Sequence, residues 1–179
     1  MPPGAADIAP NIESVRRRIT AAAVRAGRAP DSVRLIAVSK TFPADLVRAA
    51  ASAGQRSFGE NKVQEGLAKA ETLGDLQLDW HLIGHLQSNK ARKAAATFAW
   101  IESIDRLELL KKVDDAAHDA GKRPRILVQV DLAHETTKHG ADEQAVGDLV
   151  RAALESRAVE CRGLMTVPPF PTEAEDSRP

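Results

Sequence analysis

A lysine that follows an apolar run has the clearest chemical potential in this sequence. Residues 33–38 are mostly apolar and rich in β-branched side chains, which is typical of a buried strand in a parallel sheet, and Lys40 stands just past their end. Apolar walls around a lysine lower its pKa and favour the neutral amine, which attacks carbonyl groups to form a Schiff base. The alternative is an ordinary solvated lysine, and this segment alone leaves both interpretations open.

Polar or conformationally unusual residues also follow the later strand-like segments. Asn61 stands before a helical pattern, where it is either a helix N-cap or a ligand-binding residue. Met165 ends the last apolar segment, where it packs either in the core or against the ring of a ligand. Each of these positions therefore has a structural and a functional interpretation.

His81 and His85 are four residues apart, which on a helix would suit a metal ion. They stand on a predicted strand and its exit, where four residues span about 13 Å. We therefore predict no metal site from this pair. His81 is expected to be a hydrogen-bonded residue of the sheet.

The elements that must position these residues alternate between strand and helix. The predicted strands are residues 33–38, 56–58, 80–83, 99–104, 125–130 and 159–164. The predicted helices are residues 11–26, 44–53, a segment starting near Asn61, a segment with Ser88 as its N-cap, 106–120 and 143–156. This alternation predicts an α/β fold with a parallel sheet.

Two architectures compete, the doubly wound open sheet and the closed TIM (β/α)8 barrel. No strand is followed by the G-x-G-x-x-G pattern of dinucleotide-binding sheets. Polar residues at successive carboxyl ends are what the active face of a barrel needs, so the barrel is favoured. Only about six of the eight strands are predicted, so we expect one incomplete domain over residues 1–179, truncated at its C-terminus.

Composition narrows the class of protein. The 179 residues are 43% hydrophobic and 3% aromatic, with a formal net charge of zero, so the chain fits one globular domain and does not suit a nucleic-acid-binding surface. The N-terminal residues do not form a secretion signal, and no segment approaches the length of a membrane span. We therefore expect a cytoplasmic protein without nucleic-acid or membrane partners.

Several motifs, taken in order, carry a resemblance to a known family. They are AVSKT at 37–41, FGEN at 58–61, HLIGHLQSNK at 81–90, KHG at 138–140 and GLMT at 163–166. In this order the chain closely resembles the pyridoxal phosphate homeostasis protein (YggS/PROSC) family. The resemblance covers about residues 33–169.

The resemblance implies an alanine-racemase-like barrel of fold type III that binds pyridoxal 5′-phosphate (PLP). It implies that Lys40 forms the internal aldimine, and that Asn61, His81, Lys138 and Met165 are candidate cofactor-binding residues. Family members carry PLP for homeostasis, with apo PLP-dependent enzymes as recipients, and lack robust turnover. We expect a monomer.

The family continues through two more strands that hold the cofactor's phosphate, so we expect weaker retention of PLP by these 179 residues. The alternative function is a PLP-dependent amino-acid racemase. A two-base racemase needs a second proton carrier, which is a tyrosine in the barrel racemases, and this sequence contains no tyrosine. The PLP-binding protein is therefore favoured over the racemase. A third alternative is a chain that folds poorly and binds nothing.

Overall fold

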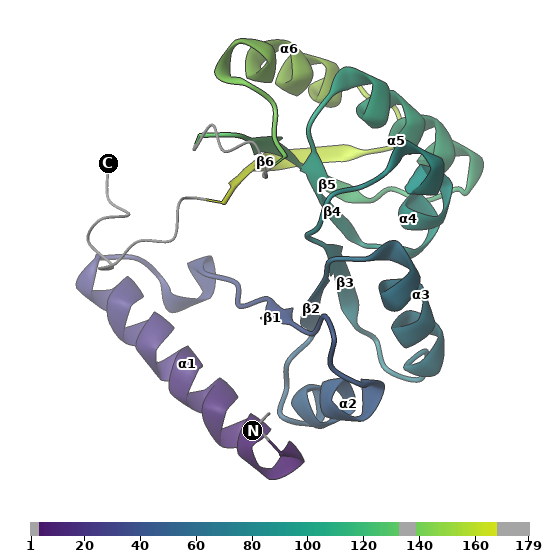
Figure 1. Ribbon diagram of the computed structural model, residues 1–179. Coiled ribbons are helices and arrows are strands. Elements are labelled where there is room, and N and C mark those ends of the chain that lie inside the picture. The colour runs from purple at the N-terminus through teal and green to yellow at the C-terminus, as the bar shows by residue number, and fades with distance from the viewer. Residues whose placement is uncertain (1–3, 133–138, 168–179) are drawn as a thin grey trace.

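The computed structural model describes residues 4–132 and 139–167, and its centre is a parallel sheet with strands in sequence order, β1-β2-β3-β4-β5-β6 (Figure 1). The strands are β1 (Ala37–Val38), β2 (Ser57–Glu60), β3 (Asp79–Leu82), β4 (Trp100–Ile104), β5 (Arg125–Val130) and β6 (Glu160–Thr166). Each strand pairs in parallel with the one before it. A doubly wound sheet would reverse this order at a switch point, so the order is that of a barrel and the six strands form part of one.

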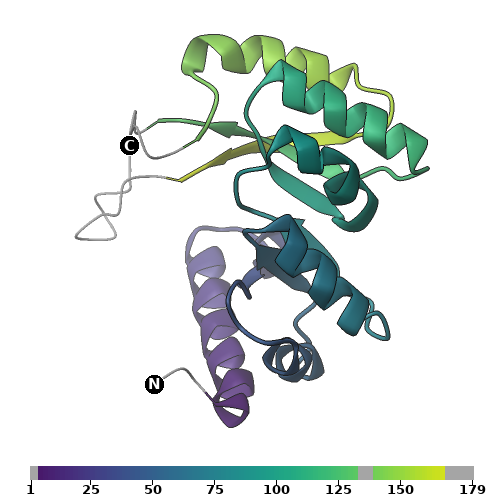
Figure 2. The same cartoon turned by 45° about the vertical axis from the view of Figure 1, so that its right-hand side comes forward.

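Helices cover the outer face of the sheet (Figures 1 and 2). They are α1 (Ala5–Arg25), α2 (Ala44–Ser52), α3 (Val63–Thr72), α4 (Ala91–Thr97), α5 (Leu107–Asp119) and α6 (Glu143–Leu154), with two short 3-10 segments, η1 (Pro30–Ser32) and η2 (Ser88–Lys90). The core between sheet and helices includes the fully buried Phe58, Leu82, Ile101, Ile126 and Leu149. None of the helices in the described part of the chain is long and apolar enough to cross a membrane.

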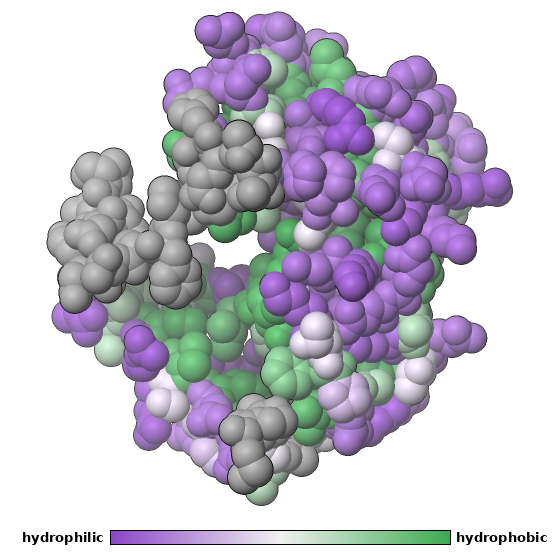
Figure 3. Space-filling view, viewed as in Figure 1, coloured by the Kyte–Doolittle hydropathy of each residue, from purple (hydrophilic) through white to green (hydrophobic). Residues whose placement is uncertain are grey.

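The two faces of the sheet carry different side chains. Phe58 and Trp80 are register partners on the helix-covered face, with ring centroids 5.9 Å apart. His81 and Trp100 are register partners on the opposite face, where the guanidinium of Arg34 lies 5.4 Å from the Trp100 ring centroid. In the space-filling view, the molecule is hollowed at its centre and hydrophobic side chains are visible around the hollow (Figure 3). The sheet face that carries His81 and Trp100 is called the inner face below.

The first helix begins earlier than the sequence predicts. A start near Asn11 is expected because proline removes a backbone donor, yet α1 begins at Ala5 and contains Pro10. The Asp7 carboxylate accepts a hydrogen bond from the Gly4 backbone N–H at 3.1 Å, and the Asp7 N–H donates to the Gly4 carbonyl at 3.0 Å. This capping at Gly4 holds the extra turn in place.

Strand β1 is shorter than predicted, with two residues instead of 33–38. In the first part of the predicted strand, Leu35 bonds to a side chain in place of a neighbouring strand, because Gln55 Nε2 donates to the carbonyl oxygens of Leu35 and Ser57, both at 2.8 Å. The buried Gln55 amide therefore joins the segment before β1 to β2, with side-chain hydrogen bonds in place of backbone pairing.

The predicted N-cap at Ser88 is wrong. Ser88 begins η2 after an N-cap at Gln87, and α4 starts only at Ala91. The Ser88 hydroxyl instead accepts a hydrogen bond from Arg106 Nη2 at 3.1 Å. By contrast, the predicted bounds of the strand at residues 125–130 are confirmed by β5.

Candidate functional site

Lys40 lies on the short loop between β1 and α2, at the carboxyl end of the sheet. Its side chain is exposed, and no hydrogen bond or ion pair to it is found among residues 4–132 and 139–167. Of the two environments that the sequence leaves open for Lys40, apolar walls or solvent, the described residues show solvent. What the structure provides is a lysine in a defined place with its amine accessible.

The residues on either side of Lys40 are fixed by a buried charged network. The ammonium of Lys69 in α3 donates to the carbonyl oxygen of Ser39 at 2.6 Å and to Glu60 Oε1 at 2.7 Å. The Ser39 hydroxyl donates to the same Glu60 oxygen at 2.6 Å. The Lys69 and Glu60 side chains are 8% and 0% exposed, so these bonds form away from water and are strong electrostatically.

The other side of Lys40 is held by Glu65. Its Oε1 accepts a hydrogen bond from the Thr41 backbone N–H at 2.6 Å and one from Lys69 Nζ at 2.8 Å. Thr41 has a φ of 67°, which is unfavourable for a β-branched residue. The network therefore maintains a strained turn directly after Lys40, as is common at functional sites.

The network also sets the ionisation of Glu65. The hydrogen bond from Lys69 is the largest influence, the bond from the Thr41 N–H adds to it, and together they hold the pKa of Glu65 below its ordinary value of 4.5. Glu65 is therefore a carboxylate at neutral pH. Its negative charge lies 2.8 Å from the Lys69 ammonium, which also bonds Glu60.

Asn61 is next to the Lys40 loop. The Ser39 N–H donates to the Gly59 carbonyl at 2.9 Å, which brings the residues after β1 alongside those after β2. Asn61 is half-buried there, and a Cβ on Gly84 would lie 2.4 Å from its carbonyl oxygen. Lys62 is the N-cap of α3, so the interpretation of Asn61 as an N-cap is wrong.

His81 is hydrogen-bonded on the inner face, as the sequence predicts. Its Nδ1 lies 2.6 Å from Glu102 Oε1, and its ring stacks on Trp100 with centroids 5.4 Å apart. His81 is 1% exposed, and its Nε2 is a buried atom without a hydrogen-bond partner in the described part of the chain. That atom has the capacity to hydrogen-bond a polar group entering from the inner face.

His85 does not share a site with His81. Its ring stacks on that of His139 with centroids 3.7 Å apart, and its Nδ1 lies 3.6 Å from Asp105 Oδ2. Desolvation and the neighbouring His139 lower the pKa of His85 from 6.5. The two histidines of the HLIGHLQSNK run therefore belong to different groups of residues.

Met165 lies on β6, at the other end of the strand order from β1, which Lys40 follows. Met165 lies in β6 opposite Gln129 of β5, and no hydrogen bond or ring contact of the described chain joins it to Lys40, Asn61 or His81. Lys138 falls outside the described residues. The structure thus brings Lys40 and Asn61 to adjacent strand ends and places His81 on the neighbouring strand.

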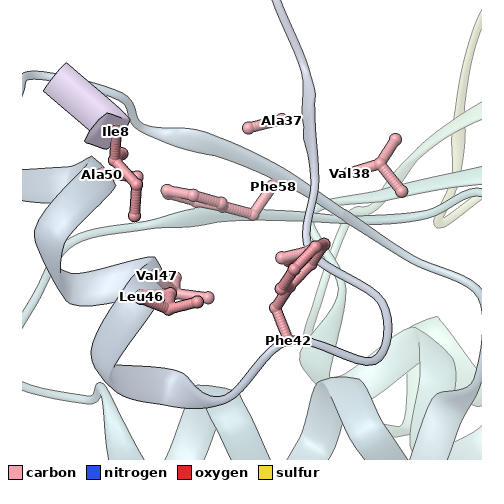
Figure 4. A pocket seen from close by; sticks show the side chains of 9 residues that line it. Ile8, Ala37, Val38, Phe42, Leu46, Val47, Ala50 and Phe58 are labelled. Carbon is pink, nitrogen blue, oxygen red and sulfur yellow. The ribbon is translucent and has the colours of Figure 1, made fainter. Parts of the chain in front are cut away.

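A pocket of about 140 Å³ lies beside β1, between α1, α2 and β2 (Figure 4). Its lining side chains are apolar except for Ser39, and they include Ile8, Phe42 and Phe58. Such a lining suits hydrophobic packing and offers no partner for a charged ligand. We therefore place the candidate site at the strand ends and the inner face.

Sequence reasoning missed the residues that hold this site together. Glu60, Glu65 and Lys69 form the network around Lys40, and Glu102 orients His81. A signal for one pair was present, since Glu65 and Lys69 are four apart on a helix and therefore lie on one face. The pairing of Glu60 with Lys69 depends on how α3 packs against β2 and has no local signal.

The sequential parallel strands, with a lysine just after the first, can be compared with known protein families. The family model described as "Alanine racemase, N-terminal domain" matches residues 9–178. An alanine racemase from Streptomyces coelicolor, 22% identical, has a TM-score of 0.67 over 84% of this chain and 40% of its own, a likeness that shows the fold alone.

Relatives of higher sequence identity show to which group within the alanine racemase N-terminal domain family the chain belongs. A pyridoxal phosphate homeostasis protein of Escherichia coli is 42% identical over 90% of this chain and 70% of its own length. The structure of PipY from Synechococcus elongatus with PLP bound is 41% identical, with a TM-score of 0.80 over 95% of this chain and 74% of that one. The chain belongs to the alanine racemase N-terminal domain family and, within it, to the pyridoxal phosphate homeostasis proteins.

Proposed function

We propose that this chain is a PLP-binding domain that acts in PLP homeostasis and holds the cofactor covalently on Lys40. The observation that carries the proposal is the placement of Lys40, whose exposed side chain lies between two residues that a buried network fixes. The PipY structure with PLP bound, 41% identical to this chain, supports the choice of cofactor.

The residues at the strand ends fit such a group. PLP supplies an aldehyde that reacts with a lysine amine and a ring that needs polar partners. Asn61 offers a half-buried amide beside the Lys40 loop, and His81 offers a buried Nε2 that has no partner in the described part of the chain. Met165 and Lys138 remain proposed contacts on the strength of the family resemblance.

Hydrogen bonds within the chain fix the backbone on both sides of Lys40. Ser39 and Thr41 are held by Lys69, Glu60 and Glu65, so the backbone at Lys40 is fixed before any ligand arrives. Pre-organisation of this kind reduces the entropy cost of binding, because the loop does not have to be ordered by the ligand.

We infer a carrier function in place of catalytic turnover, with apo PLP-dependent enzymes as recipients. We also propose a cytoplasmic monomer. Size-exclusion chromatography with light scattering tests the monomer, and reactivation of an apo PLP enzyme by the loaded protein tests transfer. Transfer is supported if reactivation by the loaded protein differs in rate from reactivation by an equal amount of free PLP.

Covalent trapping tests the assignment of Lys40. The protein is incubated with PLP, reduced with borohydride and digested, and the labelled peptide is identified by mass spectrometry. The label is expected on Lys40 and is expected to disappear in Lys40→Ala. Lys62→Ala is the matched control, because Lys62 is also exposed and follows the next strand. Label on another lysine, or undiminished label in Lys40→Ala, would overturn the assignment.

A further inference from the structure

Three side chains that can ligate a metal ion meet where β3, β4 and β5 end. They are His85, Asp105 and His139, and one ligand atom of each lies within 4.8 Å of the others. We propose that this cluster binds a divalent transition metal ion such as Zn²⁺ or Co²⁺. The proposal is independent of PLP, because Lys40 and the network that holds it take no part in the cluster.

The chain fixes the backbone of His139 against β5. Gln129 Nε2 donates a hydrogen bond to the His139 carbonyl oxygen, and the Ala141 N–H donates to the Gln129 carbonyl at 2.8 Å. The next residue is Gly140, where a Cβ would lie 2.5 Å from the Asp131 nitrogen, so only glycine permits this close approach. The imidazole of His139 is thereby presented at the end of β5.

His85 is positioned in a similar way. It follows Gly84, which packs so closely on the Asn61 backbone that any side chain would clash. From there its ring reaches His139 on one side, with centroids 3.7 Å apart, and Asp105 on the other, with Nδ1 3.6 Å from Oδ2. Asp105 and His139 come after β4 and β5, which are the next two strands of the sheet after β3.

Asp105 is oriented by the residue next to it. Arg106 Nη1 donates to Asp105 Oδ1 at 2.6 Å, and Arg106 Nη2 donates to the Ser88 hydroxyl at 3.1 Å. The second carboxylate oxygen, Oδ2, is the one that faces His85. Hydrogen bonding of one carboxylate oxygen by an outer partner is the usual way in which a ligating carboxylate is held in place.

The donor set determines which ions fit. Two imidazoles and one carboxylate suit zinc-like transition metals, whereas calcium and magnesium prefer sets made of oxygen atoms. Zinc-to-ligand distances of about 2.0–2.2 Å place tetrahedral ligand atoms about 3.4 Å apart. The His85–Asp105 pair is already at 3.6 Å. The His85 and His139 rings are stacked at 20°, so their in-plane nitrogen lone pairs are nearly parallel, and the exposed His139 side chain must rotate out of the stack to coordinate the same ion. The exposed histidines leave further coordination positions for water.

Titration with Co²⁺ tests the proposal, using untagged protein without PLP. Bound Co²⁺ is expected to give visible absorption bands that saturate at one ion per chain and disappear when Zn²⁺ is added. His139→Gln and Asp105→Asn are each expected to weaken Co²⁺ binding by about tenfold or more. His118→Gln is the matched control, because His118 is an exposed histidine on α5, outside the cluster.

The Co²⁺ titration has two results that would contradict a metal site. Absence of saturable Co²⁺ binding, or equal binding by wild type and His139→Gln, would overturn the proposal. Circular dichroism checks the fold of Asp105→Asn, and His139→Gln decides the matter if that variant unfolds, because the His139 side chain is exposed. Lys40→Ala is expected to bind Co²⁺ like the wild type, so failure of the metal site and failure of PLP binding give different results.

Discussion

The Nζ atom of Lys69 lies 2.6 Å from the carbonyl oxygen of Ser39, the residue immediately before Lys40. The same ammonium reaches Glu60 of β2 and Glu65 of α3. One buried cation therefore joins three chain segments beneath the loop that carries the proposed cofactor lysine. The position of Lys40 thus depends on residues that lie outside its own loop.

Removal of this cation is expected to destabilise the protein strongly. Lys69→Met leaves the buried carboxylate of Glu60 without its cationic partner, with only the Ser39 hydroxyl still donating to it, and breaking a buried ion pair in this way costs about 3–5 kcal/mol. Urea unfolding measures the loss. Lys111→Met is the control, because the Lys111 side chain is 78% exposed in its pair with Asp115, and surface pairs of this kind contribute little to stability. Equal losses in the two variants would contradict the central position of Lys69.

Acid is expected to weaken the contribution of Glu65. Its folded-state pKa lies below the ordinary value of 4.5, so the ionised carboxylate stabilises the fold fully above pH 4.5, and this contribution is lost as the pH falls through the lowered pKa. The difference in free energy of unfolding between wild type and Glu65→Gln should therefore shrink below pH 4.5. Urea unfolding at a series of pH values measures it.

The background variant Lys69→Met provides the control for this pH dependence. Lys69 is the main cause of the lowered pKa of Glu65, so the same Glu65→Gln comparison should vary much less with pH when Lys69 is absent. A wild-type difference that stays constant through the acid range would refute the assignment.

Relief of strain at Thr41 is expected to stabilise the protein slightly. A positive φ costs a β-branched residue about 1–2 kcal/mol, and glycine avoids this cost but loses about 0.5–1 kcal/mol in chain entropy. Thr41 has a φ of 67°, so Thr41→Gly should be more stable by up to about 1.5 kcal/mol. Thr41→Ala keeps the unfavourable φ and should show no such gain. Thermal unfolding of the two variants distinguishes them.

Two glycines should respond to alanine in opposite directions. In Gly84→Ala the new Cβ would lie 2.4 Å from the Asn61 carbonyl oxygen, and such overpacking costs about 1–3 kcal/mol or more. Gly147 lies within α6, where a new Cβ would meet no neighbouring side chain of the described residues within 4 Å, so Gly147→Ala should add about 0.5–1 kcal/mol through helix propensity. Denaturant unfolding that shows the same sign for both variants would contradict this assignment of the close approach.

The general fold could be predicted from sequence because its signals are local. The segment at residues 125–130 is mostly apolar and stands between Pro124 and Asp131, and it forms β5 with the predicted bounds. The strand at 33–38 was harder, because its pairing depends on the Gln55 side chain, which takes the place of a neighbouring strand at Leu35. A hydrogen bond between residues far apart in sequence leaves no periodicity to detect.

The candidate site could be predicted only in part, for a similar reason. Lys40 and Asn61 stand at recognisable strand ends, and the structure places them just past the ends of the adjacent strands β1 and β2. The exposure of Lys40 and the burial of Lys69 could not be read from the sequence, since both are lysines near polar residues. Whether a lysine is solvated or buried depends on the packing of α3 against the sheet, which is a tertiary property.

The sequential strand order has a consequence for biosynthesis. Because each strand pairs with the one before it, its neighbour has already left the ribosome when the strand itself emerges. The loop-closure entropy of every new pairing is limited to one strand–helix–strand unit, which favours rapid folding. Assembly during translation can therefore proceed one unit at a time, from the amino-terminal end onward.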